Sequence, residues 1–205
     1  MKKRVCSLFL TIVLLLFEFP ALAEPPSEYV GFDPIYVNGG MSLPVYSAPD
    51  ASSWRGANGK AACGTDGAIY AAGREGEWVW IAYYLNHGSN AGGWRVGYVR
   101  YSELKGLRNK IEPIKFYYLK ATLTVSSYLT DDPLGIESPI TDLRAGTELI
   151  YLIGYYDYAY VQTTYQGKTV RGFVPDNGGI TVHVPYGQYS ESYCREHFIR
   201  YDIVY

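Results

Sequence analysis

The feature that most constrains the fold is a strand pattern that occurs twice in the same order. Two aromatic residues separated by one spacer and followed by a β-branched residue stand at 78–81 (Trp-Val-Trp-Ile) and 158–161 (Tyr-Ala-Tyr-Val). A glycine, aromatic, valine triplet follows each, at Gly97 and at Gly172. Aromatic and β-branched residues favour strands. After Gly39 no stretch keeps an apolar 3.6-residue period for three turns. These patterns predict an all-β chain with two related units.

The spacing indicates how the units are organised. Trp78 and Tyr158 lie 80 positions apart and Gly97 and Gly172 lie 75 apart, so the second copy has a shorter hairpin loop. Two copies are too few for a solenoid, which needs three or more units to share a core. We therefore expect two independent domains. The predicted boundaries are a signal peptide at 1–23, an N-terminal arm at 24–39, domains at 40–104 and 118–182, a polar linker at 105–117, and a C-terminal extension at 183–205.

The repeated strand is expected to be central in its sheet. Trp78 and Trp80 share one face while Val79 and Ile81 share the other, because side chains alternate along a strand. Large apolar groups on both faces require cover on both sides. Gly97 and its counterpart Gly172 are expected at bends or bulges that turn the corner of a small barrel.

The first residues read as a signal peptide. Three basic residues at 2–4 precede an apolar run from Val5 to Phe17, and Ala21 and Ala23 supply the small residues of a cleavage site. The run is shorter than the ~20 residues needed to span a bilayer, so cleavage is favoured over anchorage. We expect a secreted or wall-associated protein without membrane insertion after cleavage.

The charge composition restricts the classes of molecule that the chain is expected to bind. Residues 24–205 carry 15 basic and 19 acidic residues, a net charge of −4. Nucleic-acid binding needs clustered Lys and Arg, so DNA and RNA are not expected partners. All 22 tyrosines lie in this part of the chain. Tyrosine favours strands and can furnish contact surfaces.

The remaining cysteines, Cys63 and Cys194, leave two alternatives open. An exported chain meets an oxidising environment, so they can form a disulfide, or both can remain unpaired buried thiols. Cys63 has no helix signal behind it, and Cys194 with His197 has no second pair to complete a metal site. His183, between two valines, is interpreted as a strand residue. We expect no cofactor, no metal and no catalytic residues.

Aromatic residues near hairpin loops are the candidate ligand contacts, because flat rings bind the apolar faces of sugars and peptides. The alternative for each ring is the core or a cross-strand pair. For Trp54, in a polar loop, exposure is favoured. The candidates are Trp54, Tyr83, Tyr84, Trp94, Tyr155, Tyr156 and Tyr165.

These motifs resemble bacterial SH3 domains, small barrels found in exported cell-wall proteins. The likeness rests on 78–81 with its counterpart 158–161 and on the glycine triplets. Each copy also opens with a strand, matched between 43–45 and 123–125, whose residues depart from the family's usual opening. The resemblance implies two small SH3-like barrels in tandem, followed by the C-terminal extension.

We consider three functions, of which the resemblance implies the first. The first is a non-catalytic extracytoplasmic protein that binds peptidoglycan or another cell-wall glycan or peptide. The second is an interaction module that holds an envelope protein through a strand edge or the C-terminal tail. A cell-wall hydrolase of the cysteine type is the third and has the least support.

Overall fold

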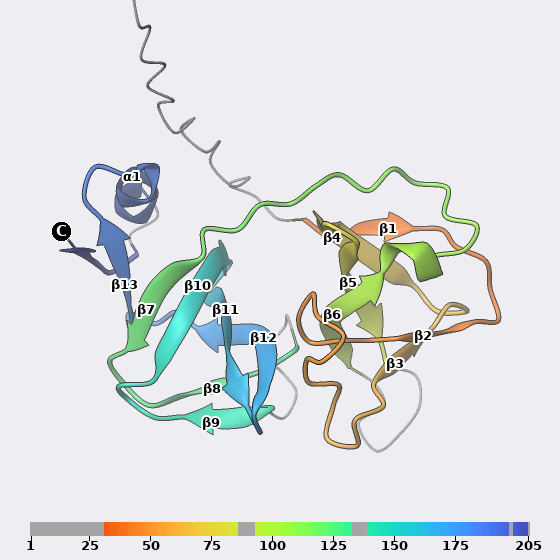
Figure 1. Ribbon diagram of the computed structural model, residues 1–205, viewed down its shortest axis with the longest axis horizontal. Helices are drawn as coiled ribbons and strands as arrows, with labels where there is room; N and C mark the ends of the chain where they lie inside the picture. Colours follow the sequence, from red (N-terminus) through yellow and green to blue (C-terminus); the bar gives the residue numbers. More distant parts are fainter. Residues whose placement is uncertain (1–30, 86–92, 133–138, 197–198, 205) are drawn as a thin grey trace, which may run out of the picture.

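The computed structural model describes residues 31–85, 93–132, 139–196 and 199–204 (Figure 1). Strands dominate these residues, together with one α-helix and one short 3-10 helix, so the all-β prediction is confirmed. None of the helices in this part of the chain is long and apolar enough to cross a membrane. The predicted signal peptide lies outside the described residues.

The described residues of the first half form six strands and the 3-10 helix η1. Strands β1, β4, β5 and β6 form a four-stranded sheet in that order, and β2 pairs with β3. The bounds are β1 Asp33–Ile35, β2 Ser42–Pro44, β3 Ala62–Gly64, β4 Ile69–Glu75, β5 Trp78–Tyr84, β6 Trp94–Arg100 and η1 Tyr101–Glu103.

The second half builds a larger sheet in the order β12-β11-β10-β7-β13-β14, with β8 paired to β9. Only the pairing of β13 with β14 is parallel within that sheet. The bounds are β7 Leu119–Leu123, β8 Ser127–Leu129, β9 Thr141–Leu143, β10 Glu148–Tyr155, β11 Tyr158–Tyr165, β12 Lys168–Pro175, β13 Ile180–Pro185, α1 Tyr189–Glu196 and β14 Tyr201–Val204.

The two halves repeat strand by strand, β1 to β6 against β7 to β12. In each half the first strand pairs with the fourth, the second pairs with the third, and the last three form a meander. The register shifts at Ala71/Gly73 in β4 and at Tyr151/Ile153 in β10, again 80 positions apart. Among the described residues neither sheet closes into a barrel.

The structure corrects the expected match of the strand openings. Leu43 lies in β2, whereas Leu123 ends β7, the counterpart of β1. The residues that occupy equivalent positions in the two halves lie just after β2 and β8. There Tyr46 forms a β-bridge with Tyr98, and Thr130 forms one with Phe173. The two Leu-x-Val segments lie on strands that are not equivalent, and strand patterns of this length carry no information about pairing partners.

Several predicted boundaries shift as well. β1 lies within the expected arm at 24–39 and pairs with β4. The expected linker at 105–117 packs along the first half, with Ile111 and Phe116 buried. The boundary expected at residue 182 falls inside β13, which continues to Pro185.

The halves are not independent in their packing, because a third core lies between them. Trp80 of β5 stacks on Tyr160 of β11, with ring centroids 4.3 Å apart and planes inclined by 23°. These two residues occupy equivalent positions of the repeat, and neither is exposed. The buried members of this shared core are Trp80, Ala82, Val96, Tyr98, Ile114, Phe116, Leu152, Ile153, Tyr160 and Phe173.

The strand β5 is covered on both sides, as predicted. Val79 and Ile81 face the core of the first half, while Trp80 faces the shared core. Gly97 is not at a bulge, which corrects that prediction: a Cβ there would overlap Val45 and the carbonyl of Tyr46. The repeated glycines therefore allow close approach of two backbones.

Candidate functional site

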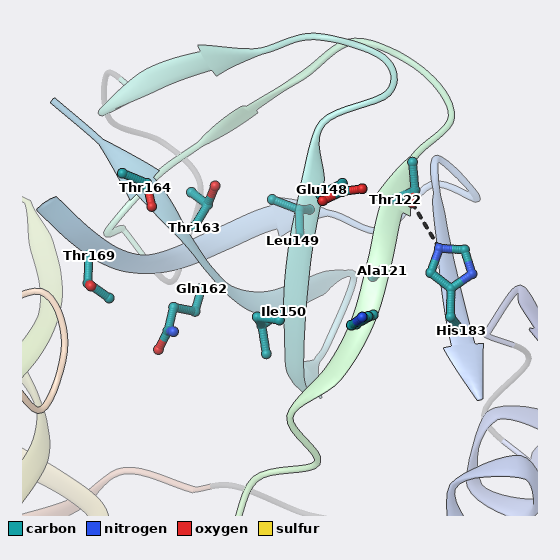
Figure 2. A pocket seen from close by; sticks show the side chains of 11 residues that line it. Ala121, Thr122, Glu148, Leu149, Ile150, Gln162, Thr163, Thr164, Thr169 and His183 are labelled. Carbon is teal, nitrogen blue, oxygen red and sulfur yellow. Dashed lines mark hydrogen bonds between the residues drawn. The ribbon is translucent and has the colours of Figure 1, made fainter. Parts of the chain in front are cut away.

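A groove lies on the six-stranded sheet, beyond the part of its face that the first half covers. Its volume is about 430 Å³. Figure 2 shows its side chains on β7, β10, β11, β12 and β13. The lining residues are Lys120, Ala121, Thr122, Glu148, Leu149, Ile150, Gln162, Thr163, Thr164, Thr169 and His183.

Strand alternation explains the composition of the groove. On β7, Leu119, Ala121 and Leu123 belong to the core of the second half, so the side chains of Lys120 and Thr122 stand on the opposite face. Along β12 that opposite face changes from apolar Phe173 in the shared core to polar residues in the groove. The sequence thus builds one sheet face that is buried at one end and polar at the other.

Three side chains at the end of the groove form a hydrogen-bonded chain. The ring of His183 lies 2.8 Å from Thr122 Oγ1 through Nε2, and 2.5 Å from Asp202 Oδ1 through Nδ1. His183 and Asp202 are direct register partners on β13 and β14. A carboxylate only accepts hydrogen bonds, so Nδ1 carries a proton. In the neutral imidazole Nε2 then accepts from the Thr122 hydroxyl.

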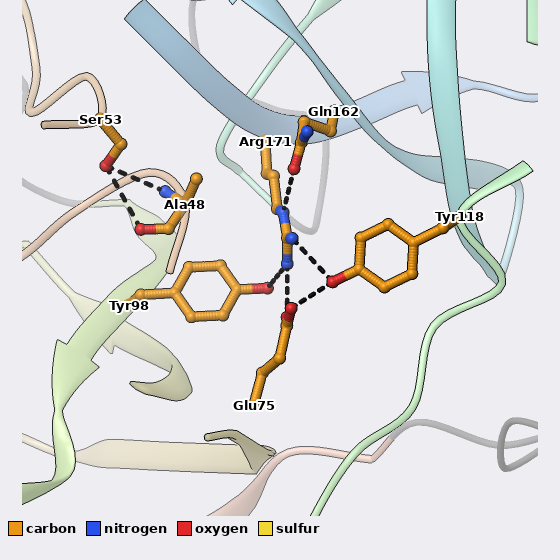
Figure 3. A network of polar contacts seen from close by, with 7 residues as sticks. All are labelled: Ala48, Ser53, Glu75, Tyr98, Tyr118, Gln162 and Arg171. Atoms are coloured by element: carbon orange, nitrogen blue, oxygen red, sulfur yellow. Dashed lines mark hydrogen bonds and ion pairs between the residues drawn. The ribbon is translucent and has the colours of Figure 1, made fainter. Parts of the chain in front are cut away.

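Arg171 contacts the groove residue Gln162 and joins the two halves (Figure 3). Its side chain is 3% exposed and pairs with Glu75 of β4 at 2.7 Å. It also donates to the hydroxyl of Tyr98 at 2.9 Å, to the hydroxyl of Tyr118 at 3.0 Å, and to Gln162 Oε1 at 2.9 Å. Because Gln162 lines the groove, this network fixes one groove wall relative to the first half.

Tyr118 is held in an unusual backbone conformation by the same network. Its φ is 54°, and its hydroxyl donates to Glu75. Burial, reinforced by the hydrogen bond to Glu75, raises the pKa of Tyr118 to about 12. The phenol therefore stays neutral at physiological pH and can donate to the carboxylate.

The seven predicted aromatic contacts do not gather at one site, although Trp54 and Tyr83 both line a small pocket of about 30 Å³. Tyr83 is buried in the core of the first half. Tyr84, 41% exposed, packs edge-on against its cross-strand partner Trp94 at 5.6 Å. Tyr155 packs edge-on against Tyr156, which is 77% exposed.

Trp54 packs across the two halves. Its ring lies edge-on to Tyr165 at 6.0 Å and contacts the core of the second half. Its backbone N–H donates to the carbonyl of Thr169 at 3.0 Å. The expectation of an exposed Trp54 is therefore corrected: the ring is half-buried because the second half covers it. None of the seven aromatic candidates lines the groove.

The cysteines are free thiols in separate cores, Cys63 in that of the first half and Cys194 in that of the second. Burial raises the pKa of Cys63 to about 12 and that of Cys194 to about 11. The thiolate is the reactive form, so neither residue is activated as a nucleophile. Among the described residues no cluster of three His, Cys, Asp or Glu could hold a metal ion.

Sequence reasoning missed the polar groove residues. The alternation of Lys120 and Thr122 with apolar neighbours was visible in the sequence and marks a polar strand face. The meeting of Thr122, His183 and Asp202 was not, since it depends on the pairing of β13 with both β7 and β14.

Comparisons with known proteins give little further guidance. No family model and no curated protein matches the chain. Two solved structures from Trichomonas vaginalis are similar to it, NlpC2 at 13% identity and NlpC1 at 11%. NlpC2 aligns over 74% of this chain and 48% of its own, with a TM-score of 0.28; NlpC1 aligns over 75% and 47%, with a TM-score of 0.26. The chain thus spans about half the length of these proteins, and a likeness this weak carries no argument.

Proposed function

We propose that the chain is an extracytoplasmic binding protein, built from two SH3-like units, that recognises peptidoglycan or another cell-wall component. The supporting observation is the groove on the six-stranded sheet. Its lining combines threonine hydroxyls and an amide with one basic and one acidic side chain, Lys120 and Glu148. Such a set can donate to and accept from the hydroxyls and amides of a glycan or peptide.

The proposed contact surface differs from the aromatic one expected from the sequence. In the groove, hydrogen bonds would orient the bound ligand, while Ile150 and Leu149 supply apolar contact. The exposed Tyr84 and the half-buried Trp94 lie on the other half and would form at most a second contact. The groove is therefore the primary binding site in this proposal.

Cosedimentation with purified cell walls tests the proposal. Residues 24–205 should sediment with the walls, and Thr164→Arg should weaken the binding at least about tenfold, which corresponds to ~1.4 kcal/mol. Thr164 is exposed on β11 and lines the groove, so an arginine there fills it without disturbing the core.

The matched control is Thr124→Arg, which adds the same charge at an exposed position outside the groove lining. It should bind as the unaltered chain does. Failure of the unaltered chain to sediment at low salt would contradict wall binding. Equal weakening by both arginines would remove the groove from the proposal.

An envelope protein as partner is the second candidate, and one observation favours it. Among the described residues β14 is the last strand of the six-stranded sheet, and no other strand of that part of the chain pairs with its outer edge, where a partner could add a strand. Capture of a partner that is lost on deletion of residues 199–205, with wall binding absent, would favour this candidate over the first.

A further inference from the structure

The chain of Asp202, His183 and Thr122 has the order of a nucleophile, a base and an orienting carboxylate. In hydrolases with such a triad, the base accepts the proton of the hydroxyl while the carboxylate fixes the tautomer and orientation of the imidazole. Here the distances are 2.8 Å from Nε2 to Thr122 Oγ1 and 2.5 Å from Nδ1 to Asp202 Oδ1. The first is an ordinary hydrogen-bond length, and the second is a short one.

The hydroxyl of Thr122 opens on the groove. Thr122 and His183 both line it, and Figure 2 shows the hydrogen bond between them at its end. Because the Thr122 proton is directed at Nε2, the remaining lone pairs of Oγ1 are available to a bound molecule. A ligand in the groove therefore meets an oxygen already hydrogen-bonded to a base.

Thr122 has one positively and one negatively charged residue near it in the groove lining. Lys120 lies two residues away on the same face of β7, and Glu148 is the direct cross-strand partner of Thr122 on β10. The ammonium of Lys120 is the cation in the groove lining that can stabilise a developing oxyanion. Glu148 opposes negative charge, so a neutral ester fits the site better than an anionic one.

We propose that the groove carries an acyl-hydrolysis centre for neutral carboxylic esters, with Thr122 as nucleophile, His183 as general base and Asp202 as positioning residue. The inference rests on the proposed function, because it takes the groove as the site where a wall component is bound. An ester-substituted glycan is the substrate class that combines the two.

The reaction balances with water as the second reactant. Thr122 Oγ1 attacks the ester carbonyl carbon while His183 Nε2 takes the hydroxyl proton. The ester C–O bond then breaks, and the proton passes from Nε2 to the departing alcohol oxygen. Water attacks the acyl-threonine and gives one proton to Nε2, which returns it to Thr122 as the carboxylic acid leaves. No oxidant or reductant is needed.

Hydrolysis of p-nitrophenyl acetate by residues 24–205 tests the inference. Thr122→Val, nearly isosteric, should lower kcat/KM at least about a hundredfold, the lower range for loss of acid–base or nucleophilic assistance. His183→Gln should do the same, and Thr122→Ser should retain activity. The matched control is Thr124→Val, an exposed threonine outside the groove lining, which should leave the rate unchanged.

Two further readouts separate catalysis from structure. An acetyl group should be trapped on Thr122 in the tryptic peptide 121–144 and be absent from Thr122→Val. Asp202→Asn should lower kcat and leave KM unchanged, since Asp202 acts through the imidazole. A rate in Thr122→Val equal to that of the unaltered chain, or an acetyl group only on Lys120, would overturn the inference.

Wall binding distinguishes this inference from the proposed function. Thr122→Val should still sediment with cell walls, with at most a small loss of affinity, because the other threonine hydroxyls, Lys120 and Glu148 remain in the groove. Binding without any esterase activity would overturn the hydrolysis centre and leave the binding function standing. Esterase activity that depends on Thr122, without wall binding, would contradict the proposal of a cell-wall ligand and would leave the hydrolysis centre standing.

Discussion

Single buried thiols give the chain a defined response to alkali. Burial raises the pKa of Cys63 from an ordinary 9.0 to about 12, and that of Cys194 from 9.0 to about 11. The unfolded chain releases these protons near pH 9, whereas the folded chain keeps them. The contribution of each thiol to stability is therefore complete below pH 9 and is lost as the pH rises towards the folded pKa.

We predict that the free energy of unfolding falls above pH 9 by about 1.4 kcal/mol per pH unit for each thiol. Cys63→Ala should remove the contribution of one thiol to this slope. Denaturant unfolding of residues 24–205 between pH 8 and pH 10 measures it, before most tyrosines titrate. An identical slope in Cys63→Ala and in the unaltered chain would contradict the assignment.

The position of Tyr156 shows how local conformation and side-chain type can disagree. It has a φ of 50° in the hairpin between β10 and β11, where the first half has Gly76 with a φ of 59°. Positive φ favours glycine. In the first copy the glycine therefore predicts the turn, whereas in the second copy the tyrosine at the equivalent position does not.

At the scale of elements, the halves contact each other through equivalent strands. The backbone N–H of Val96 in β6 donates to the carbonyl of Asp131, and that of Arg171 in β12 donates to the carbonyl of Ser47. Val96 and Arg171 directly precede the repeated glycines. The two contacts are thus reciprocal, as in an isologous dimer whose subunits are joined in one chain.

The ion pair of Arg171 with Glu75 secures this arrangement. Arg171→Met should destabilise the fold by about 2–4 kcal/mol, because it leaves Glu75 without its cation and Gln162 without its donor. Glu75 is 29% exposed, so water offsets part of the loss. The measurement is denaturant unfolding with a double-mutant cycle.

In that cycle, Arg171→Met combined with Glu75→Gln should cost less than the sum of the two single changes. Arg195→Met is the control, since Arg195 forms an exposed pair with Glu191 in α1 and its loss should have no measurable effect. Additive single changes at Arg171 and Glu75 would show that the ion pair does not couple the halves.

At the scale of the whole molecule, the predictable features are those that a single strand carries. The central strand at Trp78 and its repeat at Tyr158 could be read from local aromatic alternation, and both are confirmed. The shared core could not be predicted from the sequence, because the core of a single unit would also account for an apolar residue at Trp80. Only the structure shows that Tyr160 of the other half covers Trp80, together with Phe32 and Phe116.

The groove was unpredictable for the same reason. Its side chains come from five strands, and the hydrogen-bonded chain at its end requires Thr122, His183 and Asp202 to meet. The sequence marks His183 as a strand residue, which is correct, but the parallel addition of β14 after α1 leaves no local signal. Trp54 likewise depends on Tyr165, far along the chain.

The most direct measurement is a titration of isotope-labelled residues 24–205 with soluble disaccharide–peptide fragments of peptidoglycan, followed by amide chemical shifts in NMR. We predict that the largest shifts cluster on the groove strands, at Thr122, Thr164, Thr169 and His183. Shifts confined to Tyr84 and Trp94, or no shifts at saturating fragment, would contradict the groove as the site of wall recognition.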